Sequence, residues 1–349
     1  MISKETLEET WLKEVASGNR RAGKHLVEKV SRALLLVKGL QEADVPFVFK
    51  GGTALMLMLG SRNRLSIDID IAMSDRSLSR EVLQEIAAEK GFKECVPNER
   101  LPKEGVDKEH FKFHFAPVLN PDVPDDNVLL DIVYGDHHYD NVISTSLESQ
   151  FLRVTGNPIS LKTPSLENLV GDKLTAFAPN TTGILYTDER EMQIIKQLYD
   201  VGSAFDEIRN VEEVANTFRR TALHQMKIRN LGSDVKTVTD DILSSALTLG
   251  IRGKENPKQF AMLSSGIDRL RGHIFSETFN IERAIRDAAK AAYLAKLIET
   301  GRTTFDRVDD LKSVKGLVIG EPLDPALNNL RSSNPEAFFY WYKIFELEK

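Results

Sequence analysis

The chain has 349 residues, of which 41% are hydrophobic and 28% charged, so it is long enough for two domains and a sizeable core. Its formal net charge of -6 argues against a general electrostatic affinity for nucleic acid, so any RNA-binding site must be a local basic patch. No run approaches about eighteen apolar residues, the N-terminus is acidic and amphipathic, and Cys95 is the only cysteine, so we expect a cytoplasmic protein without a membrane span, signal peptide or disulfide.

Helical spacing dominates the first forty residues, where leucines and valines recur from Leu26 to Leu40 and predict a packing helix. A short apolar strand is then predicted at residues 47–49, followed by the turn Lys50-Gly51-Gly52-Thr53 and a buried helix to Leu59. Glycines let backbone approach a ligand, a helix N-terminus offers unpaired N–H groups, and Thr53 adds a hydroxyl, so this segment is suited to bind a triphosphate. The alternative is an ordinary turn.

Residues Leu65 to Met73 alternate isoleucines with Asp68 and Asp70, which predicts a strand carrying both carboxylates on one face. Two acids on one face repel each other unless a cation lies between them. Alpha carbons two residues apart in a strand lie about 7 Å from each other, within reach of one divalent ion or a close pair of ions. The pattern favours phosphoryl or nucleotidyl transfer, and the alternative is a solvated strand face.

Beyond a predicted helix at residues 78–90, two alternating segments at 111–116 and 128–134 predict an antiparallel pair of strands. Asp131 lies within the apolar run of the second strand, where a carboxylate is costly to bury unless its charge is compensated. Something should therefore compensate this charge, and the ordinary partner would be a nearby Lys or Arg.

Two later helices each carry a charged candidate residue. Lys173 lies at the edge of an apolar stripe between Leu166 and Phe177, a position from which most lysines extend to water. In the other helix an apolar face runs from Ile194 to Val201, and Asp200, four residues after Lys196, is predicted to share another face with that lysine.

These motifs together resemble a known family. The run KGGTAL, followed by Gly60-Ser61, Arg64 and Ser66-x-Asp68-x-Asp70, resembles the AbiEii/AbiGii toxin family of nucleotidyltransferases, which includes the MenT toxins. Segments 171–176 and 196–200 are similar to the family's lysine-bearing helix and its later basic-x-x-x-Asp segment. The resemblance covers about residues 45 to 205, and the Arg-Asp dipeptide usual before the last aspartate is not intact.

The resemblance implies an α+β fold, with a polymerase-beta-like nucleotidyltransferase domain and small mixed sheet at 1–160, then a largely α-helical domain at 161–349. It implies that an NTP gives its nucleoside monophosphate to an acceptor, most plausibly the 3′ end of tRNA, and that a cognate antitoxin restrains this activity. The catalytic residues would be Asp68, Asp70, Asp131, Lys173 and Asp200, and the first three would bind Mg²⁺, with two ions expected. The nucleotide would contact Lys50, Gly51, Gly52, Thr53, Ser66 and Lys173.

Two basic segments are candidates for an RNA acceptor, because an acidic chain needs a local patch to hold a polyanion. The first is the helix that carries Arg219, Arg220, His224, Lys227 and Arg229; the second is the cluster Arg269, Arg271, His273, Arg283 and Arg286. The aromatic run at 338–342 is interpreted as helix core rather than a base-stacking surface.

Two other functions fit the same motifs. A small-molecule nucleotidyltransferase of the antibiotic-modifying kind would show no salt-sensitive affinity for RNA. A non-catalytic binding module that keeps the fold would show no magnesium-dependent binding of NTP.

Overall fold

The computed structural model describes residues 4–19, 23–60, 64–99, 107–157 and 159–349. The chain divides into two compact units: the first runs to Ser165 and also contains Gly272–Glu277, and the second contains Leu166–Arg271 and Thr278–Lys349. The sequence placed this division at residue 160 and did not predict the return of the later segment. Both differences arise from backbone pairing, since residues 160–164 form a strand of the first unit and the amide of Leu65 donates to the carbonyl of His273.

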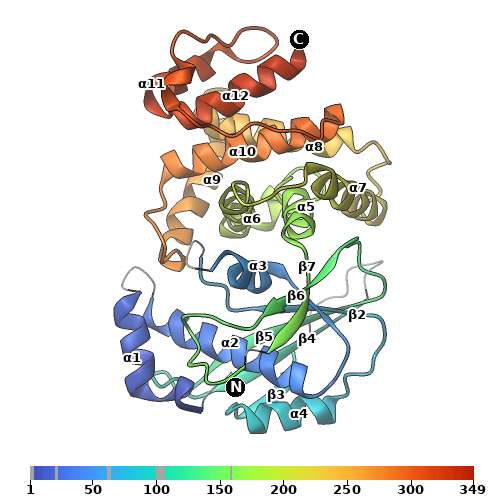
Figure 1. Ribbon diagram of the computed structural model, residues 1–349, viewed down its shortest axis with the longest axis vertical. Helices are drawn as coiled ribbons and strands as arrows, with labels where there is room; N and C mark the ends of the chain where they lie inside the picture. Colours follow the sequence, from blue (N-terminus) through green and yellow to red (C-terminus); the bar gives the residue numbers. More distant parts are fainter. Residues whose placement is uncertain (1–3, 20–22, 61–63, 100–106, 158) are drawn as a thin grey trace. The chain divides into compact units, whose positions relative to one another are not determined.

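The first unit alternates helices with short strands (Figure 1). In chain order its elements are η1 (Lys4–Leu7), α1 (Glu9–Gly18), α2 (Lys24–Glu42), β1 (Val48–Lys50), α3 (Gly51–Leu59), β2 (Ile69–Met73), α4 (Arg80–Glu89), β3 (Glu94–Pro97), β4 (Lys108–Phe115), β5 (Asp126–Tyr134), β6 (Val142–Ser146) and β7 (Ser160–Pro164).

The described strands of this unit form a five-stranded sheet in the order β1-β2-β5-β4-β3 and a separate β6-β7 hairpin. Strands β2 and β5 run parallel, whereas the other pairs in the larger sheet are antiparallel. The predicted small mixed sheet and the antiparallel pairing of β4 with β5 are therefore confirmed.

The core of the first unit lies against the apolar side of this sheet. Figure 1 shows α2 and α4 along one face and α3 on the other. The predicted packing residues of α2, from Leu26 to Leu40, are all buried. Ile69 and Ile71 are buried as well, so the alternation in β2 separates an apolar face from a polar one.

The second unit contains no strand among its described residues, as expected for a largely α-helical domain. Its longer helices are α5 (Leu166–Ala176), α6 (Glu191–Ala204), α7 (Val211–Ile228), α8 (Lys236–Gly250), α9 (Pro257–Leu270), α10 (Ile281–Thr300) and α12 (Pro335–Glu348), with short helices η2 (Tyr186–Asp188), η3 (Arg271–His273, at the junction with the first unit), η4 (Leu311–Val314), η5 (Pro325–Asn329) and α11 (Leu330–Ser333).

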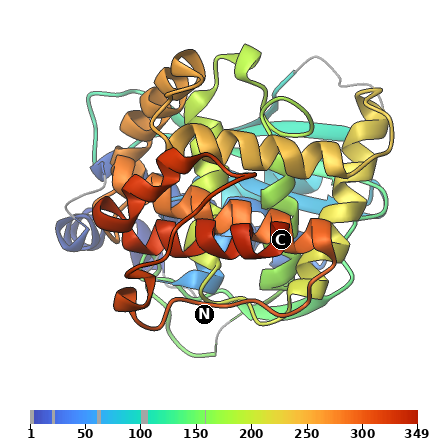
Figure 2. The same cartoon turned by 90° about the horizontal axis from the view of Figure 1, so that it is seen from above.

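The C-terminal helix α12, red in Figure 2, packs against α10. Phe338, Tyr340 and Trp341 are buried in this contact region, which confirms the interpretation of the aromatic run as core. Within the described ranges, every helix is too short or too polar to cross a membrane.

Candidate active site

Four polar residues occupy one row across the sheet of the first unit. The strand register pairs Lys50 of β1 with Asp70 of β2, Asp70 with Asp131 of β5, and Asp131 with His110 of β4. Paired residues of neighbouring strands project from the same face, and their strands lie about 4.8 Å apart. Asp70 and Asp131 therefore adjoin, flanked by a lysine on one side and a histidine on the other. We call this set the carboxylate row.

Gly51 allows the backbone to approach this row closely. It has a φ of +78°, and a Cβ atom built on it would lie 2.1 Å from Oδ2 of Asp70. Only glycine combines that backbone conformation with that closeness. The segment is not a turn before a helix at Thr53, as the sequence indicated, because α3 already begins at Gly51 with Lys50 as its N-cap.

The second glycine has a different neighbour. A Cβ atom on Gly52 would lie 2.8 Å from both Nη2 of Arg64 and Oγ of Ser66. Ser66 was assigned to the nucleotide by resemblance, and the structure places it with Arg64 against the first turn of α3. Arg64 is buried and donates from Nη1 to the carbonyl of Leu65 at 3.2 Å. A buried guanidinium beside a helix N-terminus makes this turn electropositive.

The hydroxyl of Thr53, which the sequence assigned to a triphosphate, bonds to the protein backbone. Its side chain is fully buried, and its hydroxyl donates to the backbone carbonyl of Asp68 at 2.6 Å. The hydroxyl thus fixes the backbone that carries Asp68 instead of facing a triphosphate. The same bond agrees with the start of β2 at Ile69 rather than at Leu65, since the backbone groups of Leu65 and Asp68 bond outside the neighbouring strands.

Asp131 contacts a histidine that the sequence analysis did not identify. Nδ1 of His110 lies 2.7 Å from Oδ1 of Asp131. An ionised carboxylate only accepts hydrogen bonds, so the imidazole carries a proton on Nδ1 and donates it. The predicted alternative for Asp131 was a Lys or Arg partner. Only the alternation of β4 hinted at His110, because the pairing depends on the register between two strands.

The row offers oxygen ligands suited to magnesium. Among the residues that the structure describes, no three His, Cys, Asp or Glu side chains gather as a metal-binding cluster, and the assignment of Mg²⁺ to Asp68, Asp70 and Asp131 stays a prediction. Magnesium, however, is usually held by one or two carboxylates together with substrate phosphates and water. The adjoining pair Asp70 and Asp131 fits that requirement.

The second unit contains a separate buried ion pair. Nζ of Lys173 in α5 lies 2.8 Å from Oδ2 of Asp200 in α6, and their side chains are only 10% and 1% exposed. Lys173 therefore does not extend to water, and Asp200 is buried rather than on the surface of α6. The structure does join these two site residues of the resemblance, which are distant in sequence.

The basic helix α7 is less free to bind RNA than its sequence indicates. Arg219 and Arg229 each donate to a backbone carbonyl of another segment. Arg220 and Lys227 are exposed. Leu223 of the same helix is 42% exposed and lies on the solvent side as well. The remaining basic surface of α7 is small.

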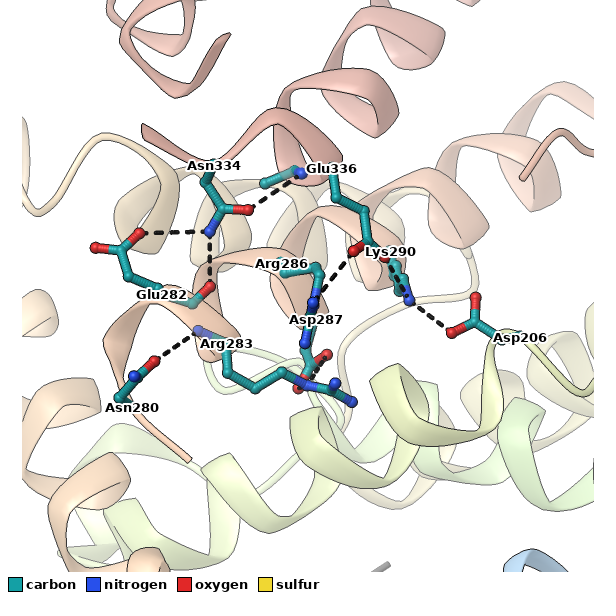
Figure 3. Close-up of polar contacts among 10 residues, drawn as sticks. Asp206, Asn280, Glu282, Arg283, Arg286, Asp287, Lys290, Asn334 and Glu336 are labelled. Carbon is teal, nitrogen blue, oxygen red and sulfur yellow. Dashed lines mark hydrogen bonds and ion pairs between the residues drawn. The ribbon is translucent and has the colours of Figure 1, made fainter. Parts of the chain in front are cut away.

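The arginines of the second basic cluster are matched by acids. Arg269 pairs with Glu191, Arg271 with Asp268, Arg283 with Asp287 and Arg286 with Glu336. Figure 3 shows the last two pairs, together with Lys290, which bridges Asp206 and Glu336. Burial raises the pKa of Asp287 to about 6, against the pull of these cations. The cluster binds helices to one another and offers little unmatched charge to RNA.

An in-register pair of carboxylates beside a glycine-led helix start is the arrangement expected of a nucleotidyltransferase. The comparison with protein families gives the same class. A family model described as "Nucleotidyl transferase AbiEii toxin, Type IV TA system" matches residues 34–300. The chain therefore belongs to the AbiEii family of nucleotidyltransferase toxins.

A solved structure titled "Crystal structure of putative nucleotidyltransferase from H. pylori" is 14% identical, with a TM-score of 0.38, over 86% of this chain and 97% of that one. The comparison with curated proteins gave no match.

Proposed function

We propose that the protein transfers a nucleoside monophosphate from an NTP to an acceptor hydroxyl, dependent on Mg²⁺, and that the acceptor is RNA, in particular the 3′ end of tRNA. Family membership supports the transfer and a toxin role that a cognate antitoxin restrains. The observation that carries the proposal is the placement of Asp70 directly beside Asp131, with Gly51 against the Asp70 carboxylate.

The chemistry follows from the groups in the row. In the reaction the acceptor oxygen bonds to the α-phosphorus, the bond from that phosphorus to the bridging oxygen breaks, and pyrophosphate leaves. The acceptor hydroxyl loses its proton, for which a carboxylate of the row is the nearest base. Asp70 and Asp131, with Asp68, would hold magnesium, which when bound neutralises phosphate charge and makes the hydroxyl more acidic.

The triphosphate requires positive charge and N–H donors. In the first unit these are Lys50 in the carboxylate row, the N-terminus of α3 at Gly51 and Gly52, and the guanidinium of Arg64. In the second unit we assign phosphate binding to Lys173, whose ammonium Asp200 holds in place. Ser66 remains assigned to the nucleotide, whereas Thr53 supports Asp68.

The test of the acceptor is transfer in solution. The purified protein is incubated with each NTP labelled at the α-phosphate, with and without total tRNA, in magnesium or in a chelator. We expect label in tRNA only when magnesium is present. Label that appears in small molecules, or none in tRNA with any NTP, overturns the RNA assignment.

The exposed residues of α7 provide a second test. We expect that reversing the charge of Arg220 and Lys227 weakens tRNA binding and flattens its salt dependence, because each lost phosphate contact lowers the slope by about one. The control reverses Lys254 and Lys258, which are exposed in the same unit. Equal salt slopes for the two variants would place RNA binding away from α7.

A further inference from the structure

His110 lies in the carboxylate row, yet the proposed transfer does not require its chemistry. Its side chain and that of Asp131 are partly enclosed, with 18% and 24% exposed. The pairing of strands β4 and β5 fixes the backbone of both residues, because His110 and Asp131 are register partners. The Nδ1–Oδ1 distance of 2.7 Å is that of a strong charge-assisted hydrogen bond.

We propose that His110 is a positioning residue for Asp131, an inference that rests on the proposed function. Asp131 lies beside a second carboxylate, Asp70, and two like charges at this spacing repel each other. The hydrogen bond from His110 opposes this repulsion, because it holds Oδ1 of Asp131 at a fixed place beside β4. The Nδ1–H group of His110, on β4, donates to Oδ1 of Asp131 and thereby fixes the side-chain torsion angles of this aspartate.

Carboxylates that bind metals depend on such donors for their orientation, and loss of the donor typically lowers metal affinity or activity about 10- to 100-fold. We therefore expect His110 to act on magnesium affinity through Asp131 while touching neither metal nor nucleotide itself. This role differs from a purely structural one, because an amide that donates from the same place would preserve it.

The chain contains a matched control. His114 is on the same strand and the same face as His110, and its Nδ1 lies 2.5 Å from Oδ2 of Asp125. Its side chain is 21% exposed, close to the value for His110. In the strand register His114 is paired with Asn127, four pairs along β4 from His110, so it lies outside the carboxylate row. Loss of a histidine–aspartate bond from β4 can thus be compared at two places.

The experiment compares His110→Leu, His110→Asn and His114→Leu in the full chain. Two quantities are measured: the affinity for Mn²⁺ alone, by titration calorimetry, and the magnesium concentration that gives half-maximal transfer. We expect His110→Leu to weaken Mn²⁺ binding and raise the magnesium requirement about 10- to 100-fold, His110→Asn to restore most of both, and His114→Leu to change neither. Thermal unfolding checks that each variant is folded.

The possible failures are distinct. If the wild type transfers and binds Mn²⁺, and His110→Leu equals it in both, the positioning role is overturned and the proposed function stands. The role is also overturned if His110→Asn is as impaired as His110→Leu, or if His114→Leu is equally impaired. If the wild type neither binds Mn²⁺ nor transfers, the proposed function is overturned, and this inference with it.

Discussion

Replacement of Gly51 by alanine should abolish most of the transfer activity without unfolding the protein. At a φ of +78°, alanine costs about 1–2 kcal/mol relative to its preferred backbone conformation. The new Cβ atom would lie 2.1 Å from Oδ2 of Asp70, whereas real contacts of Cβ atoms do not fall below 3.0 Å. Asp70 must therefore move by about 1 Å, and a misplacement of that size in an active site costs about 10²-fold in rate.

Gly91 offers a control for the backbone effect. It has the same φ of +78°, and a Cβ atom on it would meet only Leu7 Cδ1 at an ordinary 3.5 Å. We expect the backbone conformation to cost Gly51→Ala and Gly91→Ala about 1–2 kcal/mol of unfolding free energy each, while only Gly51→Ala loses transfer. Denaturant unfolding and initial transfer rates measure the two effects. Full transfer activity of Gly51→Ala, or equal losses of transfer activity in both variants, would refute the reasoning.

Three further predictions concern single charged residues. Asp70→Asn should remove transfer while the protein stays folded, because a neutral amide is a poorer ligand for Mg²⁺ than a carboxylate; wild-type turnover in this variant would exclude Asp70 from the site. Lys173→Met should cost about 3–5 kcal/mol of unfolding free energy, since it removes the cation that pairs with the buried Asp200. The double variant Lys173→Met, Asp200→Asn should regain part of this free energy. A loss below about 1 kcal/mol in Lys173→Met would contradict the buried pair. The pKa of Asp287 is raised from 3.8 to about 6, so the folded state binds this proton more tightly than the unfolded state. The stability of the wild type relative to Asp287→Asn should therefore rise by about 1 kcal/mol as pH falls from about 7.5 to about 5; a difference independent of pH would show that Asp287 has an ordinary pKa.

Local sequence patterns predicted the parts of the site that depend on local structure. The alternation around Asp70 gave the strand and its polar face, and Gly51-Gly52 marked the close approach to α3. The apolar surroundings of Asp131 signalled that its charge needed a partner, although not which one. In each case the physical constraint acts within a few residues, so the sequence carries it directly.

The partners of these residues could not be predicted in the same way. The bond of His110 to Asp131 depends on the register between β4 and β5, and the bond of Thr53 to Asp68 depends on how α3 lies over the start of β2. Spacing along α6 relates Asp200 only to residues of its own helix, and says nothing about α5, which supplies Lys173. Contacts between elements decide these cases.

The most direct test of the account is which phosphorus atom of the NTP reaches the acceptor. Purified protein is incubated with tRNA, magnesium and the preferred NTP, labelled in one reaction at the α-phosphate and in another at the γ-phosphate. A nucleotidyltransferase that uses the carboxylate row transfers the α label to tRNA and releases the γ label in pyrophosphate, and Asp70→Asn transfers neither. Transfer of the γ label to tRNA, or transfer of the α label that survives in Asp70→Asn, would contradict the account.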